Sequence, residues 1–441
     1  MGKNNLHNKI NKYINEIKSY KFKHLLLYFL LLIIINYEEN SIGNNLIKVA
    51  YYCNSFKYGG IERIFSILVK YLTKEKYFNI TLITKEIKQK EEYSLPKGIK
   101  RIILSHQKMN LCQSVIREKI DILIYNYEDK EIKNLNKLKK TKVIYYNHSS
   151  FLYWLYQRYI YKFKDTVYQM YKNCKYIISL IPIESNYLFK KWGIKSVLLD
   201  NPCTYEYDSI QPSNLTNKNI IMIGRANDPV KRYELGIKAM ETIIEEIPSC
   251  EMYIISSYNN NFKNLINNLK LQKSVKFTGY HEKIDIYLKN ASLHILSSIS
   301  ETYPMALSEA KIFGIPTIIC GLDYLALAKE GTVIIYDDNP ESIGKEAIKI
   351  LKDDEYRKKL GREARKSMKN RKNKYIAKIW VKLLLSIYKG DDKFYEKLSN
   401  ENKITEEEAN LILNNQLNIL KKRNNRFWNL TLEQFTSYQF S

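Results

Sequence analysis

The stretch LHILSSISETYPMALSEAKIFGIPTIIC, residues 293–320, contains a strand, a loop, a helix, a turn and a second strand. The short apolar run Leu293–Leu296 predicts a buried strand, and the apolar spacing of Met305–Phe313 predicts a helix. Gly314 is typical of the position that ends a helix, and Thr317–Cys320 indicates the next strand. A helix between two such strands predicts a parallel α/β sheet.

The same alternation extends along the chain on both sides of this stretch. Further strands are expected at Leu46–Cys53, Ile80–Thr84, Ile102–Leu104, Ile122–Tyr125, Lys142–Tyr146, Tyr176–Leu180, Val197–Leu199, Asn219–Ile223, Met252–Ser256, Val275–Thr278 and Val333–Tyr336. Further helices are expected at Ile61–Leu72, Glu234–Glu246, Phe262–Leu269, Ile284–Lys289 and Ser342–Leu351. The pattern predicts the α/β class, with two Rossmann-like, doubly wound domains that face each other across a ligand-binding cleft.

The chain has 441 residues, which is long enough for two such domains. Its expected segments are a basic and hydrophobic N-terminal helical segment (1–45), a first Rossmann-like domain (46–202), a polar and proline-containing linker (203–218), a second Rossmann-like domain (219–390) and a helical C-terminal tail (391–441). Each domain should place its ligand-binding residues in loops after its strands.

Composition narrows the classes of partner. The formal net charge is +25, but lysines are scattered along the whole chain instead of forming one stripe, which argues against nucleic-acid binding. The scattered lysines are explained by a general enrichment of the whole sequence in this residue. Attraction to an anionic membrane or an anionic substrate is the alternative explanation. The six cysteines lack metal-ligand spacing and are expected to be reduced core residues.

Two loops of the first domain contain candidate binding residues. Gly59 and Gly60 follow the first strand, where they let the backbone approach a ligand and lead into a helix N-terminus that favours an anion. A pair of glycines is by itself more often only a turn. His148 follows the strand Lys142–Tyr146, where a neutral imidazole can hydrogen-bond a hydroxyl, although a lone histidine is more often structural.

In the second domain, Arg225 and Lys231 bracket a short loop after the strand Asn219–Ile223. Two cations on one loop can bind a diphosphate, with roughly 1.5–3 kcal/mol from each charge-assisted hydrogen bond. A solvated surface loop is the alternative for this segment.

Glu301 and Glu309 stand eight positions apart around the start of a helix. Pro304 suits the first helical position, and the free N–H groups there can bind phosphate. The Glu309 carboxylate could accept hydrogen bonds from two vicinal hydroxyls, such as a ribose diol. A capped helix that carries a surface glutamate is the alternative.

Taken in order, these motifs resemble the family-4 retaining glycosyltransferases of the GT-B fold, also described as glycosyl transferases group 1. The resemblance covers roughly residues 46–390. It rests on Gly59-Gly60-Ile61-Glu62-Arg63, His148, Gly224-Arg225 with Lys231, and Glu301 with Glu309 ahead of Gly314-Ile315-Pro316. The last of these elements is the most specific.

The resemblance implies a donor site for a nucleotide-diphosphate sugar, UDP- or GDP-linked. Arg225 and Lys231 would neutralise the diphosphate, and Glu309 would hold the ribose. The donor sugar would be positioned by Glu301 and by the backbone at Tyr303, Pro304 and Met305, close to Gly59, Gly60 and His148. The catalytic set implied is His148, Arg225, Lys231 and Glu301.

The resemblance further implies transfer of a hexose, with retention of configuration, to a glycan or lipid-linked acceptor. The leaving phosphate would accept the acceptor's proton, so neither a metal nor another cofactor is expected. Asp337-Asp338 and Asp353-Asp354 are accordingly interpreted as solvated surface. The aromatic segment Phe151–Tyr171, which includes Trp154, is the candidate for contact with the acceptor.

Two departures from the family pattern leave the donor open. Ser256-Ser257-Tyr258 stands where many members have Gly-x-Gly, and Thr302-Tyr303-Pro304 replaces the usual Gly-Phe-Gly. A nucleotide-sugar epimerase of the same fold and a catalytically inactive membrane scaffold are the alternatives to a transferase.

The N-terminal segment has a membrane-associated pattern. Several lysines within residues 1–23 precede eleven apolar residues, Leu25–Ile35, which is short against the roughly 20 that a spanning helix needs. A short anchor, an interfacial helix, a cleaved signal peptide and a helix buried on the enzyme remain open. A glycan on the sequon at Asn147 would disrupt the site at His148, so we expect a membrane-associated protein with a cytoplasmic catalytic domain.

Overall fold

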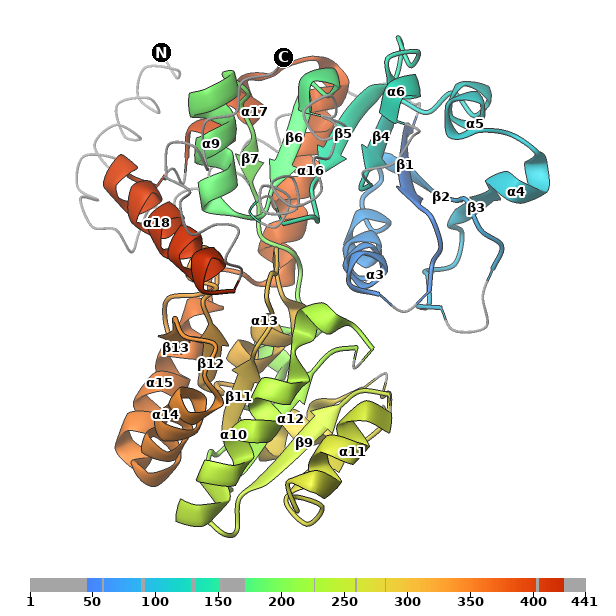
Figure 1. Ribbon diagram of the computed structural model, residues 1–441. Coiled ribbons are helices and arrows are strands. Elements are labelled where there is room, and N and C mark those ends of the chain that lie inside the picture. The colour runs from blue at the N-terminus through green and yellow to red at the C-terminus, as the bar shows by residue number, and fades with distance from the viewer. Residues whose placement is uncertain are drawn as a thin grey trace, which may run out of the picture.

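A computed structural model describes residues 46–57, 59–88, 92–127, 132–150, 152, 171–225, 227–257, 260–281, 283–401 and 404–423. These residues form two lobes, each built around one parallel sheet (Figure 1). The predicted α/β class and the two facing Rossmann-like domains are confirmed. The apolar run Leu25–Ile35 and most of the aromatic segment Phe151–Tyr171 lie outside the described residues.

The first lobe contains a seven-stranded sheet in the order β3-β2-β1-β4-β5-β6-β7. Its strands are β1 (Ile47–Cys53), β2 (Phe78–Thr84), β3 (Lys100–Ile103), β4 (Ile122–Tyr125), β5 (Lys142–Tyr146), β6 (Tyr176–Ser179) and β7 (Val197–Leu198). Its helices are α3 (Gly60–Leu72), α4 (Leu104–Gln107), α5 (Leu111–Arg117), α6 (Ile132–Leu135) and α9 (Pro182–Trp192). Strand β1 is buried along its length except at Lys48, because helices cover both faces of a parallel sheet.

The second lobe contains a six-stranded sheet in the order β10-β9-β8-β11-β12-β13. Its strands are β8 (Asn219–Ile223), β9 (Glu251–Ile255), β10 (Val275–Phe277), β11 (Leu293–Leu296), β12 (Thr317–Cys320) and β13 (Thr332–Ile335). Its helices are α10 (Tyr233–Glu246), α11 (Asn260–Asn268), α12 (Asp285–Asn290), α13 (Met305–Ile312), α14 (Pro340–Lys352) and α15 (Asp354–Ser367).

The stretch 293–320 folds as the sequence predicts, with β11 and β12 as parallel neighbours joined through α13. Pro304 lies one position earlier than expected: it is the extended N-cap residue, and the helix begins at Met305. Gly314 follows the helix in the left-handed region, at φ 68°. All six cysteines are free and buried, as predicted.

Three more helices follow the second lobe, α16 (Asn373–Lys389), α17 (Lys393–Asn400) and α18 (Glu406–Arg423). The sequence grouped residues up to 390 with the second domain, but α16 packs against α3 in the first lobe, where the Trp380 ring lies 5.1 Å from that of Tyr146. Helix α17 contacts β7. The chain therefore returns to the first lobe before residue 390 (Figure 1).

Within the described ranges, no helix combines the length and apolar character that a membrane span requires.

Candidate active site

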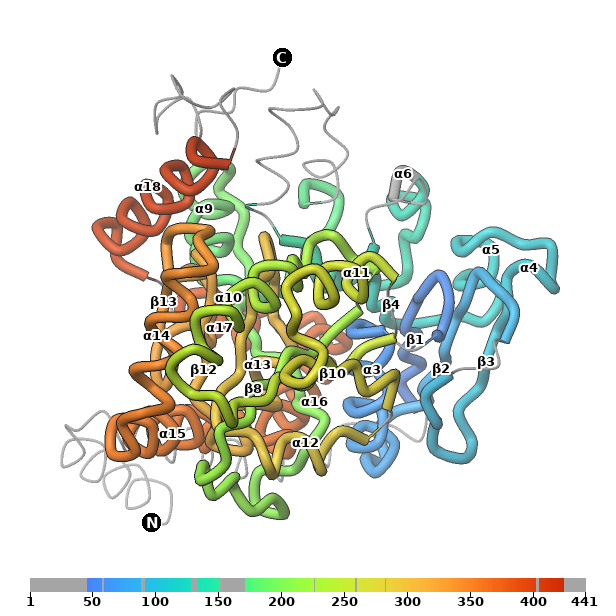
Figure 2. Tube along the Cα trace, turned by 60° about the horizontal axis from the view of Figure 1, so that its bottom comes forward, coloured from blue at the N-terminus to red at the C-terminus, as the bar shows by residue number. Residues whose placement is uncertain are grey.

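A cavity of about 320 Å³ lies between the lobes. Its lining is Gly60, Ile61, Ile64, His148, Ser149, Ser150, Leu180, Asn201, Arg225, Asp228, Val230, Lys231, Ser300, Glu301, Thr302, Tyr303 and Met305. Figure 2 shows α3 of the first lobe close to the second-lobe elements that it faces. Most of the predicted site residues therefore converge on one cleft, from positions far apart in the sequence.

The topology of the two sheets explains this convergence. In the first sheet the strand order reverses between β1 and β4, and the Gly59-Gly60 turn follows β1. In the second sheet the order reverses between β8 and β11, which lead to Arg225 and Glu301 respectively. Parallel α/β sheets bind ligands in the crevice at such reversals, beyond the carboxyl ends of the strands.

Lys231 and Glu301 form an ion pair in the cleft, with 2.6 Å between Nζ and Oε1. The Ser298 hydroxyl donates to the same carboxylate oxygen at 2.7 Å. The loop that carries Lys231 is held by Ser297, whose hydroxyl contacts the Lys231 carbonyl oxygen at 2.8 Å. The ammonium group thus has a defined position between two strand ends.

Arg225 is more exposed than Lys231. Its side chain is 77% exposed and forms an ion pair with Asp228 at 2.9 Å. Across the cleft, the Glu62 carboxylate accepts a hydrogen bond from Tyr127 at 3.0 Å. Burial raises the pKa of Glu62, while the Tyr127 hydrogen bond and the Arg225 charge act in the opposite direction. Arg225 therefore influences a carboxylate of the other lobe.

Glu309 does not line the cavity. Its carboxylate is 1% exposed and accepts hydrogen bonds from Arg63 at 2.9 Å and from Thr204 at 2.5 Å. Arg63 also donates to the Tyr93 hydroxyl at 2.9 Å. Since Arg63 belongs to α3 and Glu309 to α13, this pair joins the lobes. Arg63 is part of the motif that begins at Gly59, but the sequence did not predict its contact with Glu309.

His148 is half-buried in the lining of the cleft cavity, and its ring lies 4.1 Å from the ring of Tyr146. Burial lowers the pKa of His148 to about 3, so the imidazole is neutral at ordinary pH. Among the described residues its Nε2 atom has no hydrogen-bond partner. Its backbone oxygen accepts a hydrogen bond from the Thr302 hydroxyl at 2.9 Å, which ties the loops of the two lobes together.

The space around Gly59 and Gly60 and the burial of Tyr303 shape the wall of the site. A Cβ atom at Gly60 would meet no neighbouring atom within 4 Å, whereas one at Gly59 would lie 2.3 Å from the Glu62 carboxylate. The absence of a side chain at Gly60 therefore keeps space open beside the cavity. Tyr303 is buried, and burial raises the pKa of its hydroxyl.

The side chain of Asn147, the first residue of a sequon, is hydrogen-bonded inside the protein. The Asn147 side chain is buried, accepts a hydrogen bond from Tyr145 at 3.0 Å and donates to Glu184 at 2.6 Å. Its amide is therefore inaccessible to glycosylation in the folded protein.

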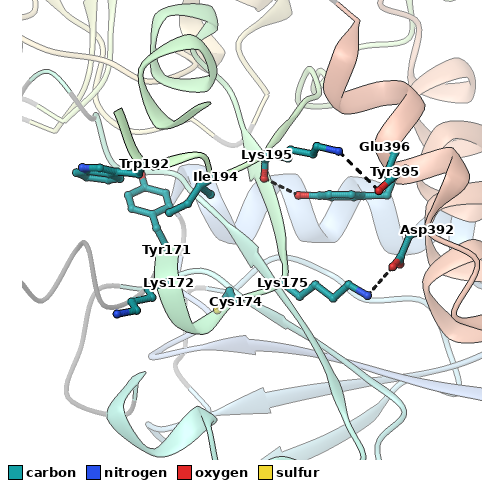
Figure 3. Close-up of a pocket in the computed structure, with 10 residues that line it drawn as sticks. All are labelled: Tyr171, Lys172, Cys174, Lys175, Trp192, Ile194, Lys195, Asp392, Tyr395 and Glu396. Atoms are coloured by element: carbon teal, nitrogen blue, oxygen red, sulfur yellow. Dashed lines mark hydrogen bonds and ion pairs between the residues drawn. The ribbon is translucent and has the colours of Figure 1, made fainter. Parts of the chain in front are cut away.

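A larger cavity, about 450 Å³, lies between α17 and the first lobe (Figure 3). Two of its three lysines form ion pairs with acidic residues of the lining, Lys175 with Asp392 at 2.5 Å and Lys195 with Glu396 at 3.6 Å. Tyr171, the last residue of the aromatic segment Phe151–Tyr171, lines this cavity, but none of the predicted donor-binding or catalytic residues does. Within the described ranges, no three His, Cys, Asp or Glu side chains are grouped in a way that could hold a metal ion.

We expect acid to destabilise the protein through His148 and His294. The His294 residue is completely buried and His148 is half-buried, and burial lowers each pKa from 6.5 to about 3. The unfolded chain therefore binds these protons first as pH falls, so the contribution of the neutral rings is complete above pH 6.5 and declines towards pH 3. At pH 5 each histidine should cost roughly 2 kcal/mol of unfolding free energy.

Denaturant titrations between pH 5 and pH 8 measure this effect. Replacing His294 with Gln should remove about half of the decline, while the exposed His106→Gln should leave it intact. An unchanged pH slope in the His294→Gln protein would show that this ring is not kept neutral by burial.

Two solved structures share the two-lobe arrangement. Sucrose-phosphate synthase from Thermosynechococcus elongatus matches with a TM-score of 0.64 at 15% identity, over 78% of this chain and 100% of that one. Alr3699/HepE from Anabaena, solved in complex with UDP and glucose, matches with a TM-score of 0.61 at 14% identity, over 77% of this chain and 100% of that one. The two lobes therefore have the GT-B fold.

The sequence of the second lobe gives the family. Residues 205–367 match the model described as glycosyl transferases group 1. The match covers most of the second lobe and none of the first. An uncharacterized glycosyltransferase of Haemophilus influenzae is 26% identical over 183 residues, which are 39% of this chain. The match spans 50% of that relative's own length.

Proposed function

We propose that the protein transfers a hexose from a UDP- or GDP-linked sugar to a glycan or lipid-linked acceptor, with retention of configuration and without a metal. The observation that carries this proposal is the Lys231–Glu301 pair, which lies with Arg225 at the strand ends facing the first lobe. The complex of Alr3699/HepE with UDP and glucose supports a nucleotide sugar as donor.

In this mechanism Arg225 and Lys231 bind the donor diphosphate. Lys231 is already held between two strand ends, so little reorganisation is needed when negative charge develops on the departing diphosphate. The phosphate that leaves accepts the proton of the attacking hydroxyl on the same face of the sugar. The main task of the protein is then orientation and charge stabilisation.

Glu301 and His148 would position the donor sugar. Glu301 can accept a hydrogen bond from a sugar hydroxyl on its second carboxylate oxygen, since Lys231 contacts only Oε1. His148 stays neutral, because burial holds its pKa at about 3. It therefore acts as a hydrogen-bonding group and not as a cation or a general acid.

Glu309 would receive the ribose. Since its carboxylate is engaged by Arg63 and Thr204, a ribose diol must share or replace one of these hydrogen bonds. Nucleotide binding would thereby be sensitive to the distance between the lobes.

We also propose that the protein is membrane-associated, with its catalytic domain in the cytoplasm. The support is the basic and apolar N-terminal sequence, together with a sequon at Asn147 whose side chain is buried.

A donor screen tests the proposed reaction. Purified protein would be incubated with UDP- and GDP-linked hexoses, with and without glycan or lipid-linked acceptors, and nucleotide release would be measured. Acceptor-dependent release with retained anomeric configuration is expected. A changed sugar without any acceptor would indicate an epimerase, and binding of neither UDP nor GDP in calorimetry would indicate an inactive scaffold.

A further inference from the structure

The C-terminal helix α18 lies across both lobes, next to α9 and near β13 (Figures 1 and 2). On the first lobe, the Asn186 side chain donates to the Ile404 carbonyl at 3.1 Å, just before the helix, and Lys190 pairs with Glu406 at 2.9 Å. Its buried apolar side chains are Ala409, Leu413, Leu417, Ile419 and Leu420. The remaining contacts of α18 lead towards the cleft by two routes.

The first route runs through Asp338. Arg423, at the end of α18, contacts this carboxylate with two nitrogens, at 2.6 and 3.0 Å. Arg232 contacts the same carboxylate at 2.7 Å from the other side. The sequence interpretation of Asp338 as solvated surface is therefore wrong, because two arginines that are distant in sequence enclose it.

Arg232 is the residue next to Lys231, and its backbone adopts the left-handed conformation, at φ 46°. Its side chain donates to the Ser297 carbonyl at 2.8 Å, while the Ser297 hydroxyl contacts the Arg232 carbonyl at 2.9 Å. An L residue with positive φ persists only where its surroundings hold it. The Asp338 contact is one of the restraints on the loop that presents Lys231.

The second route runs through the loop after β12. Gln416 of α18 donates to the Gly321 carbonyl at 2.6 Å and to Asp323 at 2.7 Å. The helix approaches so closely that a Cβ atom on Gly321 would lie 2.6 Å from the Ile419 side chain. These contacts restrain the loop that follows β12.

The residue after Asp323 is Tyr324, and its hydroxyl accepts a hydrogen bond from the Glu301 N–H at 3.2 Å and donates to the Glu301 carbonyl at 3.1 Å. The backbone of Glu301 is therefore supported by a side chain whose own loop α18 restrains. The two routes end on the two partners of the cleft ion pair, Lys231 and Glu301.

We propose that α18 is a positioning element for the donor site, and that Arg423 is a positioning residue that acts through Asp338 and Arg232 on Lys231. The expected effect of α18 on the rate of turnover rests on the proposed function. The restraint of residues 227–232 and 299–303 by α18 does not depend on any bound ligand.

Hydrogen–deuterium exchange of the full chain tests it. Arg423→Met keeps the apolar stem but removes both contacts to Asp338 and the hydrogen bond from Nη1 to the Ile299 carbonyl at 3.4 Å. Amide exchange in residues 227–232 and 299–303 should therefore become about tenfold faster. Arg423→Lys should restore part of the protection. Lys329→Ala removes an exposed α18 ion pair, with Glu408 at 2.7 Å, and should leave both segments as in the unaltered protein.

Unchanged exchange in Arg423→Met, or an increase spread evenly over both lobes, would overturn the inference. Asp338→Asn, which weakens the Arg423–Asp338 contact without altering α18, should give the increase in residues 227–232 and guards against a folding defect at residue 423. With an active donor from the screen, kcat of Arg423→Met should fall about tenfold with little change in donor KM. Failure of the unaltered protein to bind UDP or GDP would refute the proposed function, while the exchange comparison would still decide the role of α18.

Discussion

Replacing both Arg225 and Lys231 with alanine should lower kcat/KM for sugar transfer by roughly 10²–10⁴-fold. Each side chain is expected to supply a charge-assisted hydrogen bond of roughly 1.5–3 kcal/mol to the diphosphate, and the loss should be greatest as the leaving group departs. Both side chains line the cleft cavity, so their removal changes the charge at the reaction site directly. Initial-rate kinetics with the active donor measures the effect.

The matched control removes two lysines that are exposed and distant from the cavity, Lys238 and Lys359, from the same lobe. This double variant alters the net charge equally and should keep the rate of the unaltered protein. Thermal unfolding of both variants separates lost catalysis from lost folding. A near-normal rate in Arg225→Ala/Lys231→Ala would show that the site is assigned to the wrong cations.

Replacing Trp380 with alanine should destabilise the protein by roughly 3–5 kcal/mol. Trp380 is completely buried, and its ring packs at 5.1 Å against the Tyr146 ring, between α16 and the first sheet. The truncation would leave a large cavity where the returning chain joins the first lobe. Equilibrium unfolding in denaturant measures the free energy of unfolding.

Tyr388 provides the comparison, because it lies on the same helix and is 39% exposed. Tyr388→Ala should change the free energy of unfolding by no more than roughly 0.5 kcal/mol. Equal effects of the two substitutions would contradict the packing of α16 on the first lobe.

The sequence predicted the elements whose signal is local. Leu293–Leu296 and Thr317–Cys320 were predicted as strands and match β11 and β12 at both ends, because short, largely apolar runs have few alternatives and Pro316 directly precedes the second run. The return of α16 to the first lobe was not predicted. An amphipathic helix pattern shows that one face is buried, but it does not identify the sheet that covers this face.

In the candidate site, too, the sequence predicted some features and not others. Gly60, His148, Arg225, Lys231 and Glu301 were predicted to share a cleft, and the structure places them around one cavity, because each follows a strand and parallel strands end on a common edge. Their roles in binding and transfer remain predictions.

The partners of these residues could not be predicted. Arg63 reaches Glu309 across 246 positions, and Arg423 reaches Asp338 across 85 positions. A charged residue in a sequence carries no information on which distant charge it meets. The acceptor segment around Trp154 lies outside the described residues, and its role also stays a prediction.

A crystal structure of the protein with a bound nucleoside diphosphate sugar tests the central claim most directly. We predict diphosphate oxygens within hydrogen-bonding distance of Arg225 and Lys231, with the ribose hydroxyls at Glu309. A nucleotide bound instead in the cavity between α17 and the first lobe, with both cations free of phosphate, would contradict the account.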